Sequence, residues 1–279
     1  MSQTSAKMDW LTVTKTGMKA SGFSEGAMIA RWVTHTLKVK TGGMVETAPQ
    51  RFYQYCHTSI NPEGLTVAAS ESDVQGIRVT MSGTFLSSVD QKALAERVID
   101  QGWHVTRCDI ALDIIGSAET VLDIDKQRQS SYAGRPRLRT LVDNPQGSTL
   151  YIGSRQSEKM LRIYDKGMEA KLGRWDWLRY EMEYKGNTAR AALAVVKKGL
   201  FGAVISDVLD FVGVPGGITE NHLSEFEHTE GIVPSVPDRD RIAWYETSVI
   251  PALDKLKRES TADYDRVIAL LAASGHIPW

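Results

Sequence analysis

The sequence predicts an α+β protein with a largely antiparallel sheet, helices on one face of that sheet, and a helical C-terminal region. Three observations lead to this prediction. Short segments that alternate apolar and polar residues follow one another with brief turns between them. Single segments with helical spacing interrupt these runs, without the regular alternation of a parallel βαβ fold. The same order of strands and helices recurs along the chain, which indicates two similar halves, although no repeat is visible residue by residue.

The predicted strands carry β-branched or aromatic residues and are separated by turn sequences. Two of these turns are Asn-Pro-Glu-Gly at 61–64 and Asn-Pro-Gln-Gly at 144–147. Because short turns of this kind join neighbouring antiparallel strands, we expect a mainly antiparallel sheet. The predicted strands cover residues 9–14, 51–59, 65–69, 76–83, 103–114, 137–142, 148–152, 160–166 and 175–184.

Helices are predicted where apolar residues recur every three or four positions. The clearest covers residues 91–101, with Asp90 as its N-cap and Gly102 just after its end. Gly199 closes a second amphipathic segment, and the pattern at 119–129 fits more than one structure. The remaining predicted helices cover residues 25–37, 187–198, 203–212, 238–257 and 261–273.

The length and composition indicate a folded, cytoplasmic protein without a membrane partner. A chain of 279 residues can form one large domain or two smaller ones, and we divide it into residues 1–200 and a helical region, 201–279. No run approaches about 18 consecutive apolar residues, the length that spans a membrane. The N-terminus lacks the apolar core of a secretion signal. Cys56 and Cys108 stand alone, as expected for buried thiols in a reducing compartment.

The near-zero net charge conceals a basic middle segment. Residues 126–200 contain 16 basic and 7 acidic side chains, whereas residues 201–279 contain 6 basic and 13 acidic ones. A basic surface can follow the phosphates of a nucleic acid. The plain alternative is a solvated basic face, or one that pairs with the acidic C-terminal region, which includes an acidic loop at 220–230.

The first chemically informative segment is Thr-Arg-Cys-Asp-Ile-Ala-Leu-Asp at 106–113. Alternate side chains of a strand share a face, so Arg107, Asp109 and Asp113 point the same way. Aspartate is disfavoured in strands, so two on one face call for a reason. They lie about 13 Å apart along a strand, too far to bind one ion together. The plain alternative is an edge strand with a solvated face.

The second segment, Leu-Arg-Tyr-Glu-Met-Glu-Tyr-Lys at 178–185, repeats this arrangement. Arg179, Glu181 and Glu183 share one face. If this strand neighbours the first one, Asp109 stands within a few ångströms of a glutamate, because adjacent strands are about 4.8 Å apart. Carboxylate oxygens suit Mg²⁺ or Mn²⁺ and do not suit zinc. The alternative is a set of cross-strand Arg–Glu ion pairs on a wet surface.

The third segment, Leu-Arg-Ile-Tyr-Asp-Lys-Gly at 161–167, sets Tyr164 between Arg162 and Lys166 on one face. A phenol nucleophile toward phosphate needs such cations, which hold the phosphate and favour the phenolate. A basic turn at 151–159, which begins with Tyr151, precedes this segment and can approach a nucleic-acid backbone. The plain alternative for Tyr164 is packing plus one hydrogen bond.

Taken together and in this order, TRCDIALD, TLYIGSRQSEKMLRIYDKG and LRYEMEYKGNTAR resemble the replication initiation factor family. Its members are the trans-acting Rep proteins of small rolling-circle plasmids, with relatives in filamentous phages and integrative elements. The resemblance covers roughly residues 8–200 and is strongest at 106–190. Residues after 200 match no family that we recognise.

The resemblance implies a protein that nicks one strand at an origin through a tyrosine, which becomes joined to the 5′-phosphate with the help of a divalent metal. It favours Tyr164 as the nucleophile, with Tyr151 as the alternative. It favours Asp109 and Glu181 as ligands of Mg²⁺ or Mn²⁺, with Asp113 and Glu183 as alternates. The chain has no His-hydrophobe-His triplet, the metal site of other nickases, and this fits the family.

We therefore predict a rolling-circle replication initiator that acts as a DNA nickase and strand transferase. Its partners would be double- and single-stranded origin DNA, a host helicase and a second copy of the chain. Two alternatives remain: an origin-binding protein without catalysis, and a metal-dependent phosphodiesterase that uses activated water. The cations expected to contact DNA are Arg107, Arg155, Lys159, Arg162, Lys166 and Arg179.

Overall fold

A computed structural model gives the fold of the chain in two compact units, Met1–Ser235 and Val236–Trp279. Each unit is described here by itself. Within them, the structure describes residues 3–19, 26–39, 43–47, 55–71, 75–131, 137–213, 232 and 250–273.

The first unit is built on one sheet, in which the described residues form ten strands. Every neighbouring pair of strands is antiparallel, so the predicted α+β fold with an antiparallel sheet is confirmed. The strands are β1 (Gln3–Lys15), β2 (Val45–Thr47), β3 (Tyr55–Ile60), β4 (Leu65–Ser70), β5 (Ile77–Ser82), β6 (His104–Ile115), β7 (Arg139–Asn144), β8 (Gly147–Ile152), β9 (Lys159–Asp165) and β10 (Trp177–Lys185).

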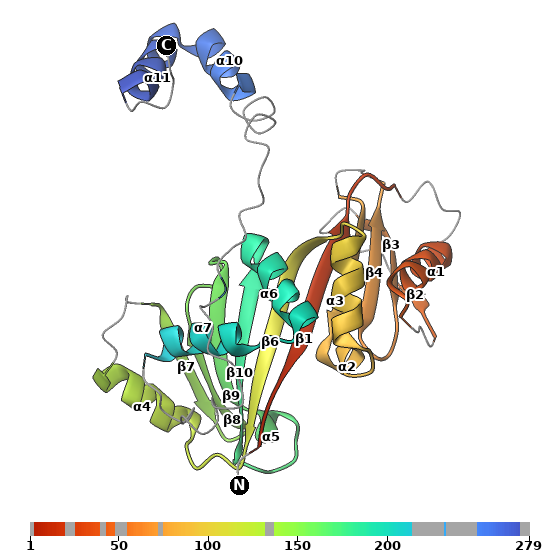
Figure 1. Cartoon of the computed structure of the whole chain (residues 1–279), viewed down its shortest axis with the longest axis vertical. Coiled ribbons are helices and arrows are strands. Elements are labelled where there is room, and N and C mark those ends of the chain that lie inside the picture. Colours follow the sequence, from red (N-terminus) through yellow and green to blue (C-terminus); the bar gives the residue numbers. More distant parts are fainter. Residues whose placement is uncertain are drawn as a thin grey trace. The chain divides into compact units, whose positions relative to one another are not determined.

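The order of the strands reveals two halves with the same topology. Across the sheet the order is β2-β3-β4-β5-β1-β6-β10-β9-β8-β7, so β1 and β6 form the centre. Each central strand leads, through a helix, into four consecutive strands, and the last of these returns beside the central strand (Figure 1). The long strands β6 and β10 therefore lie side by side at the middle of the sheet.

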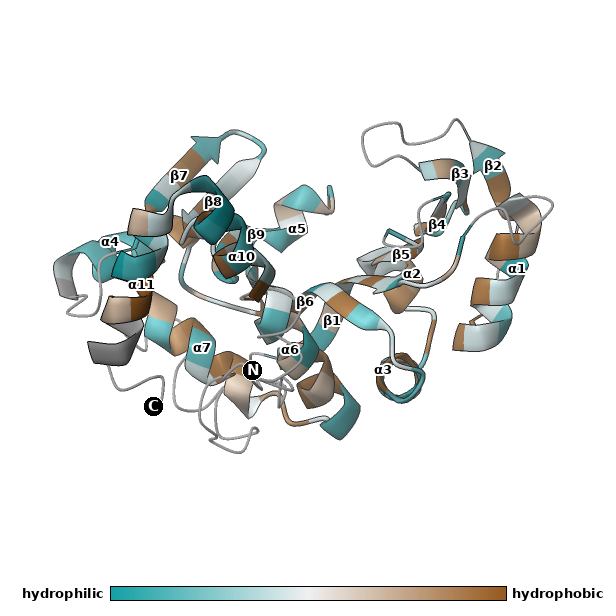
Figure 2. Cartoon of the chain, turned by 90° about the horizontal axis from the view of Figure 1, so that it is seen from above, coloured by the Kyte–Doolittle hydropathy of each residue, from teal (hydrophilic) through white to brown (hydrophobic). Residues whose placement is uncertain are grey.

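Helices cover one face of this sheet. In Figure 2, α3 (Gln91–Asp100), α6 (Gly186–Lys198) and α7 (Gly202–Val212) lie on one side of β1 and β6, and the outer strands β2 and β7 rise on the other side. Asp90 caps α3 as predicted, because its carboxylate accepts a hydrogen bond from the Ala93 amide at 3.0 Å. The ambiguous segment at 119–129 is largely helical, as α4. The described helices of this unit are α1 (Gly26–Leu37), α2 (Gly83–Leu86), α3 (Gln91–Asp100), α4 (Val121–Ser131), α5 (Lys166–Glu169), α6 (Gly186–Lys198) and α7 (Gly202–Val212).

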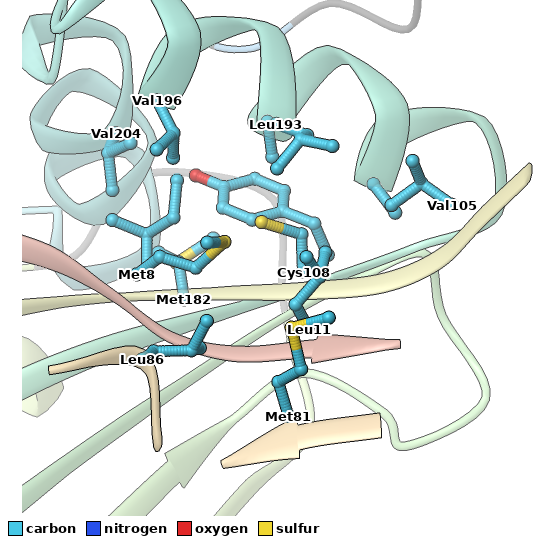
Figure 3. Close-up of a cluster of buried hydrophobic side chains, with 14 of the residues drawn as sticks. Met8, Leu11, Met81, Leu86, Val105, Cys108, Met182, Leu193, Val196 and Val204 are labelled. Atoms are coloured by element: carbon cyan, nitrogen blue, oxygen red, sulfur yellow. The ribbon is translucent and has the colours of Figure 1, made fainter. Parts of the chain in front are cut away.

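The core lies between the sheet and these helices. Cys108 of β6 and Met182 of β10 point toward Leu193 and Val196 of α6 (Figure 3). Val204 of α7 joins the same cluster, so the core continues past the boundary at residue 200 that the sequence predicts. Because the helices bury this face, the opposite face of the central strands is left for polar side chains.

The second unit contains two described helices, α10 (Ile250–Glu259) and α11 (Thr261–Ala273), which pack against each other. The start of the helix predicted at 238–257 and the acidic loop at 220–230 lie outside the described residues. Over the described part of the chain, none of the helices has both the length and the apolar character that crossing a membrane requires.

Candidate active site on the open face of the sheet

Three adjacent strands carry polar side chains on the face that the helices leave open. The register sets Glu183 of β10 opposite Asp109 of β6, and Glu181 of β10 opposite Arg162 of β9. The sequence analysis placed Asp109 near a glutamate only if these two strands were neighbours, and β6 and β10 are neighbours. Three carboxylates, two cations and Tyr164 therefore lie on one surface. The carboxylates are those of Asp109, Glu181 and Glu183, and the cations are Arg107 and Arg162.

Tyr164 forms a compact group with Glu181 and Arg162. The Tyr164 hydroxyl donates a hydrogen bond to Oε2 of Glu181 at 3.0 Å, while Nη2 of Arg162 lies 2.5 Å from Oε1 of the same carboxylate. The Arg162 guanidinium also lies over the tyrosine ring, 5.0 Å from its centre. Lys166, which begins α5 instead of continuing β9, stands 5.9 Å from the ring centre. A phenol, an acceptor for its proton and two cations thus meet at one place.

The ionisation of Tyr164 differs from the expectation. Its side chain is only 7% exposed, and this burial, together with the nearby negative charge of Glu181, raises the pKa of the phenol. Arg179 and Arg162 act in the opposite direction and do not compensate. Arg162 favours the phenolate as predicted, but in the free protein burial and the charge of Glu181 outweigh it.

A second group surrounds Asp109, which is almost fully buried. Arg107 donates to Asp109 through Nε and Nη2 and reaches Oε2 of Glu183 at 2.8 Å, so its guanidinium bridges the two carboxylates. Lys185 pairs with the other oxygen of Glu183 at 2.5 Å. Arg107 also lies over the ring of Trp10 of the neighbouring strand β1, 5.1 Å from the ring centre.

Asp109 is incompletely neutralised. Burial, followed by repulsion from Glu181 and Glu183, raises its pKa to about 7, although the hydrogen bonds from Arg107 act to lower it. A carboxyl group that titrates near neutral pH beside two further carboxylates is a feature typical of functional sites.

Asp113 belongs to a different group. Its two oxygens accept hydrogen bonds from Nε and Nη2 of Arg179 at 2.7 and 2.8 Å, and Trp177 donates a third at 3.0 Å. Although burial alone would raise the pKa of Asp113, these bonds lower it overall. Arg179 also donates to Oδ1 of Asp9 at 2.9 Å and is only 2% exposed. The structure therefore brings Asp113 together with Arg179, apart from Asp109.

The carboxylates of the Tyr164 group and the Asp109 group together fit a divalent cation that prefers oxygen ligands. Asp109, Glu181 and Glu183 supply carboxylate oxygens from two adjacent strands, the ligand chemistry of Mg²⁺ and Mn²⁺. Within the described residues, no three acidic, histidine or cysteine side chains are already arranged around a common point. The Arg107 guanidinium stands between Asp109 and Glu183, so a cation shared by these two carboxylates requires Arg107 to move.

Two of the predicted DNA-contacting cations differ from the other four, because one faces the helices and the other is buried within the open face. Lys159 has the strand parity of Leu161 and Ile163, so it faces the helices, where its Nζ pairs with Asp207 of α7 at 2.7 Å. Arg179 is buried between two aspartates. Alternation along β9 alone was enough to assign Lys159 to the helix side, whereas the burial of Arg179 depends on Asp9 of a distant strand.

Two cavities open on this surface, one beside each candidate tyrosine. Tyr164 lines a cavity of about 490 Å³, and Tyr151 lines one of about 290 Å³. Tyr151 is half-buried and stands opposite Arg162 in the register of β8 and β9. The residues that line both cavities are Arg107, Arg162 and Glu181. Arg155 lines the smaller cavity and Lys166 the larger one.

Sequence reasoning missed the contribution of β1 to the site. The register with β6 passes from Met8 opposite Ile110 to Trp10 opposite Asp109, so Asp9 is the extra residue of a β-bulge. The bulge brings Asp9 to Arg179 and keeps Trp10 on the open face beside Arg107. A bulge breaks the alternation on which the sequence analysis relied, so residues 9–14 were interpreted as a regular strand.

Residues 103–203, from just before β6 to the start of α7, match the model of the replication initiation factor family. The resemblance to the replication initiation factors is confirmed. The matched segment contains Asp109, Glu181, Glu183 and both candidate tyrosines.

Two proteins are similar to this chain. The chain is 28% identical over 148 residues to the putative DNA relaxase NicK of Bacillus subtilis (strain 168), an alignment that covers 44% of this chain and 41% of NicK. It therefore spans less than half the length of that relative. The solved structure of a rolling circle replication initiator protein from Geobacillus stearothermophilus has a TM-score of 0.64 at 17% identity, over 83% of this chain and 99% of that one. That similarity shows a shared fold.

Proposed function

We propose that this protein initiates rolling-circle replication by nicking one strand of an origin through a covalent 5′-phosphotyrosine. The observation that carries the proposal is the hydrogen bond from Tyr164 to Glu181, beside Arg162, at the edge of a cavity on the open sheet face. The match to the replication initiation factors over this same segment supports it. So do the names of the two relatives, a relaxase and a rolling-circle initiator.

In the proposed step, the phenol oxygen of Tyr164 attacks the scissile phosphorus in line with the 3′ oxygen. The bond between phosphorus and that oxygen breaks as the tyrosine–phosphorus bond forms. The phenol proton passes to Glu181, which already accepts its hydrogen bond, and the 3′ oxygen takes a proton from water. The product is a free 3′-hydroxyl that can prime synthesis, and the phosphotyrosine keeps the bond energy for later closure.

The raised pKa of Tyr164 fits a nucleophile that is activated only when DNA is bound. In the free protein, burial and Glu181 hold the phenol in its protonated form. Arg162 and Lys166 flank the ring and would contact the phosphate that enters the site. A base within hydrogen-bond reach then removes the proton in the reaction itself, so a resting phenolate is not required.

Asp109, Glu181 and Glu183 are the residues that would hold Mg²⁺ or Mn²⁺ in the proposed site. The ion, when bound, would polarise the scissile phosphate and stabilise its developing charge. We assign Asp113 a different role: it holds Arg179, which in turn fixes Asp9 at the rim of the cavity. Arg107, Arg155, Arg162 and Lys166 are the cations that we propose to contact the DNA backbone. Lys159 and Arg179 are left out of this set because they are engaged elsewhere.

The division of the chain into a nicking region, residues 1–200, and a helical C-terminal region, residues 201–279, that is either accessory or packed on the main domain is likewise a proposal. The packing of α7 against β10 means that this helix belongs with the nicking unit in structural terms. The host helicase and the second copy of the chain stay predictions.

A nicking assay separates this proposal from its two alternatives. The protein is incubated with Mg²⁺ or Mn²⁺ and a supercoiled plasmid that carries the DNA flanking its own coding sequence. The proposal predicts open circles together with a protein–DNA adduct that survives denaturation. Open circles without an adduct would point to a phosphodiesterase that uses water. Retarded DNA without cleavage would point to an origin-binding protein without catalysis.

A further inference from the structure

The cavity beside Tyr164 extends well beyond the groups that the nicking step needs. Its volume of about 490 Å³ falls in the range of roughly 300–1,000 Å³ that small-molecule sites occupy. Tyr164, Glu181 and the cations Arg107, Arg162 and Lys166 line one part of it. Asp9, Trp10 and the segment that begins at Gly83 line another. We call this second part the Asp9 pocket.

Arg107 and Arg179 also border the Asp9 pocket, and the carboxylate of Asp9 gives it an acceptor that suits a nucleobase. A carboxylate repels phosphate, whereas it accepts hydrogen bonds from the N–H groups on the edge of a base. Oδ1 of Asp9 accepts from Arg179, and the described residues offer no partner to Oδ2. The Asp9 side chain is 20% exposed, so this oxygen has access to a ligand.

Trp10 supplies an aromatic wall held in a fixed position. Its indole N–H donates to Oγ1 of Thr12 at 3.0 Å, and the Arg107 guanidinium lies over its ring. Aromatic side chains that line a cationic groove are the usual stacking surfaces for unpaired bases. Because Arg107 also borders the carboxylate group of the site, a base near Trp10 would lie next to the phosphate under attack.

Gly83 preserves the space around Asp9. A Cβ atom at this position would lie 2.5 Å from Oδ1 of Asp9, closer than atoms can approach without a shift. A side chain here would therefore displace the carboxylate from Arg179. The absence of a side chain keeps Asp9 where the bulge of β1 puts it.

We propose that the Asp9 pocket binds one unpaired base of the DNA strand, next to the scissile phosphate, and that it prefers guanine. Guanine alone has two neighbouring N–H donors on its Watson–Crick edge, N1–H and the 2-amino group, which match the two oxygens of a carboxylate. The other three bases present an acceptor beside each donor, and a carboxylate repels it. This inference rests on the proposed function, because it assigns the base that this same site would select.

The test uses the full-length protein and deoxynucleoside monophosphates as probes. Binding of dGMP, dAMP, dCMP, dTMP and inorganic phosphate is measured by calorimetry. We expect dGMP to bind at least about ten-fold more tightly than the other probes, and dIMP, which lacks the 2-amino group, to lose most of this preference. Equal binding of all four nucleotides, or binding no tighter than that of inorganic phosphate, would overturn the proposal.

Three variants assign the effect to the pocket. Asp9→Asn removes the negative charge at nearly constant size and is expected to abolish the preference for dGMP. Trp10→Ala should weaken every nucleotide by about five-fold or more, since stacking does not depend on the base. Trp175→Ala is the matched control, because this tryptophan is 50% exposed and does not line the cavity. Melting curves show whether each variant is folded, and Asp9→Asn carries the test if Trp10→Ala is not.

Nicking of supercoiled DNA, measured in parallel, separates failure of the pocket from failure of the proposed function. Nicking with an adduct, but without a preference for dGMP, overturns the pocket alone. A preference for dGMP that Asp9→Asn removes supports the pocket even if no nicking is seen, and the absence of nicking then counts against the proposed function.

Discussion

The hydroxyl of Tyr164 lies 3.0 Å from Oε2 of Glu181, so a phenol on β9 donates a hydrogen bond to a carboxylate on the neighbouring strand β10. Glu181 is held in turn by Arg162, which stands opposite it in the strand register. This arrangement pairs the proposed nucleophile with the proposed base and an orienting cation, which is the arrangement that nucleophilic catalysis requires. Each of the predictions below removes or tests one part of it.

Tyr164→Phe is expected to abolish the covalent adduct while leaving DNA binding nearly unchanged. The substitution removes only the attacking oxygen, and the cations around the cavity remain. Adduct formation on denaturing gels and retardation on native gels measure the two properties. Tyr151→Phe is the matched control, and an adduct that disappears in this variant instead would transfer the nucleophile to Tyr151.

Glu181→Gln should slow nicking by at least about 10²-fold, because it removes the proposed general base and one of the proposed metal ligands together. The same change should lower the pKa of Tyr164, because the negative charge of Glu181 helps to raise it. Single-turnover cleavage rates measure the first effect, and the ultraviolet absorbance of the phenolate during an alkaline titration measures the second. A variant that cleaves at the wild-type rate would exclude Glu181 as the proton acceptor.

The stability of the protein should fall as the pH rises from about 4 to about 7, through the contribution of Asp109. Its pKa in the folded state is about 7, above the ordinary value of 3.8, so in this interval the folded state binds the proton more tightly than the unfolded state does. The stabilisation is complete below the lower value and is lost once the pH exceeds the upper one. Urea denaturation across this range measures the slope, and Asp109→Asn should flatten it.

Arg179→Met is expected to destabilise the fold by about 3–5 kcal/mol, because it leaves the buried carboxylate of Asp113 without its partner. Arg174→Met is the control: Arg174 makes a similar two-pronged pair with Asp176, but these side chains are 42% and 45% exposed, and we expect no measurable change. Denaturant midpoints compare the two variants. Equal effects would mean that burial of the Arg179 pair contributes nothing.

Arg107→Gln should strengthen Mn²⁺ binding while it weakens DNA binding. The guanidinium bridges Asp109 and Glu183, so its removal frees two carboxylates for a cation. It also removes one positive charge from the wall that both cavities share. Calorimetric titration with Mn²⁺ in the absence of DNA gives the affinity without reference to activity, and a weaker affinity in the variant would place the cation elsewhere.

Much of the site follows from strand alternation, because a period of two decides which side chains share a face. The side chains of Asp109, Glu181 and Tyr164 meet on the open face for this reason, once β6, β10 and β9 are neighbours. Alternation also assigns Lys159 to the helix side, where its partner is Asp207. The sequence analysis counted Lys159 among the DNA-contacting cations because the turn is basic, and did not consider which face of β9 Lys159 lies on.

Other features depend on contacts that the sequence does not display. Asp9 joins the site only because a bulge shifts the register of β1 against β6. The pKa of Tyr164 is set by burial, which depends on how the sheet packs and not on the cations that flank the tyrosine in sequence. The extension of the core past residue 200 depends on α7, whose partner strand, β10, precedes it by a whole helix.

The most direct test of the nicking mechanism is mass spectrometry of the trypsin-digested protein–DNA adduct. Cleavage after Arg162 and Lys166 isolates Tyr164 in a four-residue peptide, whereas Tyr151 falls in the separate peptide that ends at Arg155. The proposed mechanism predicts that the nucleotide remnant is attached to the four-residue peptide. A remnant on the Tyr151 peptide, or cleaved DNA with no modified peptide at all, would contradict it.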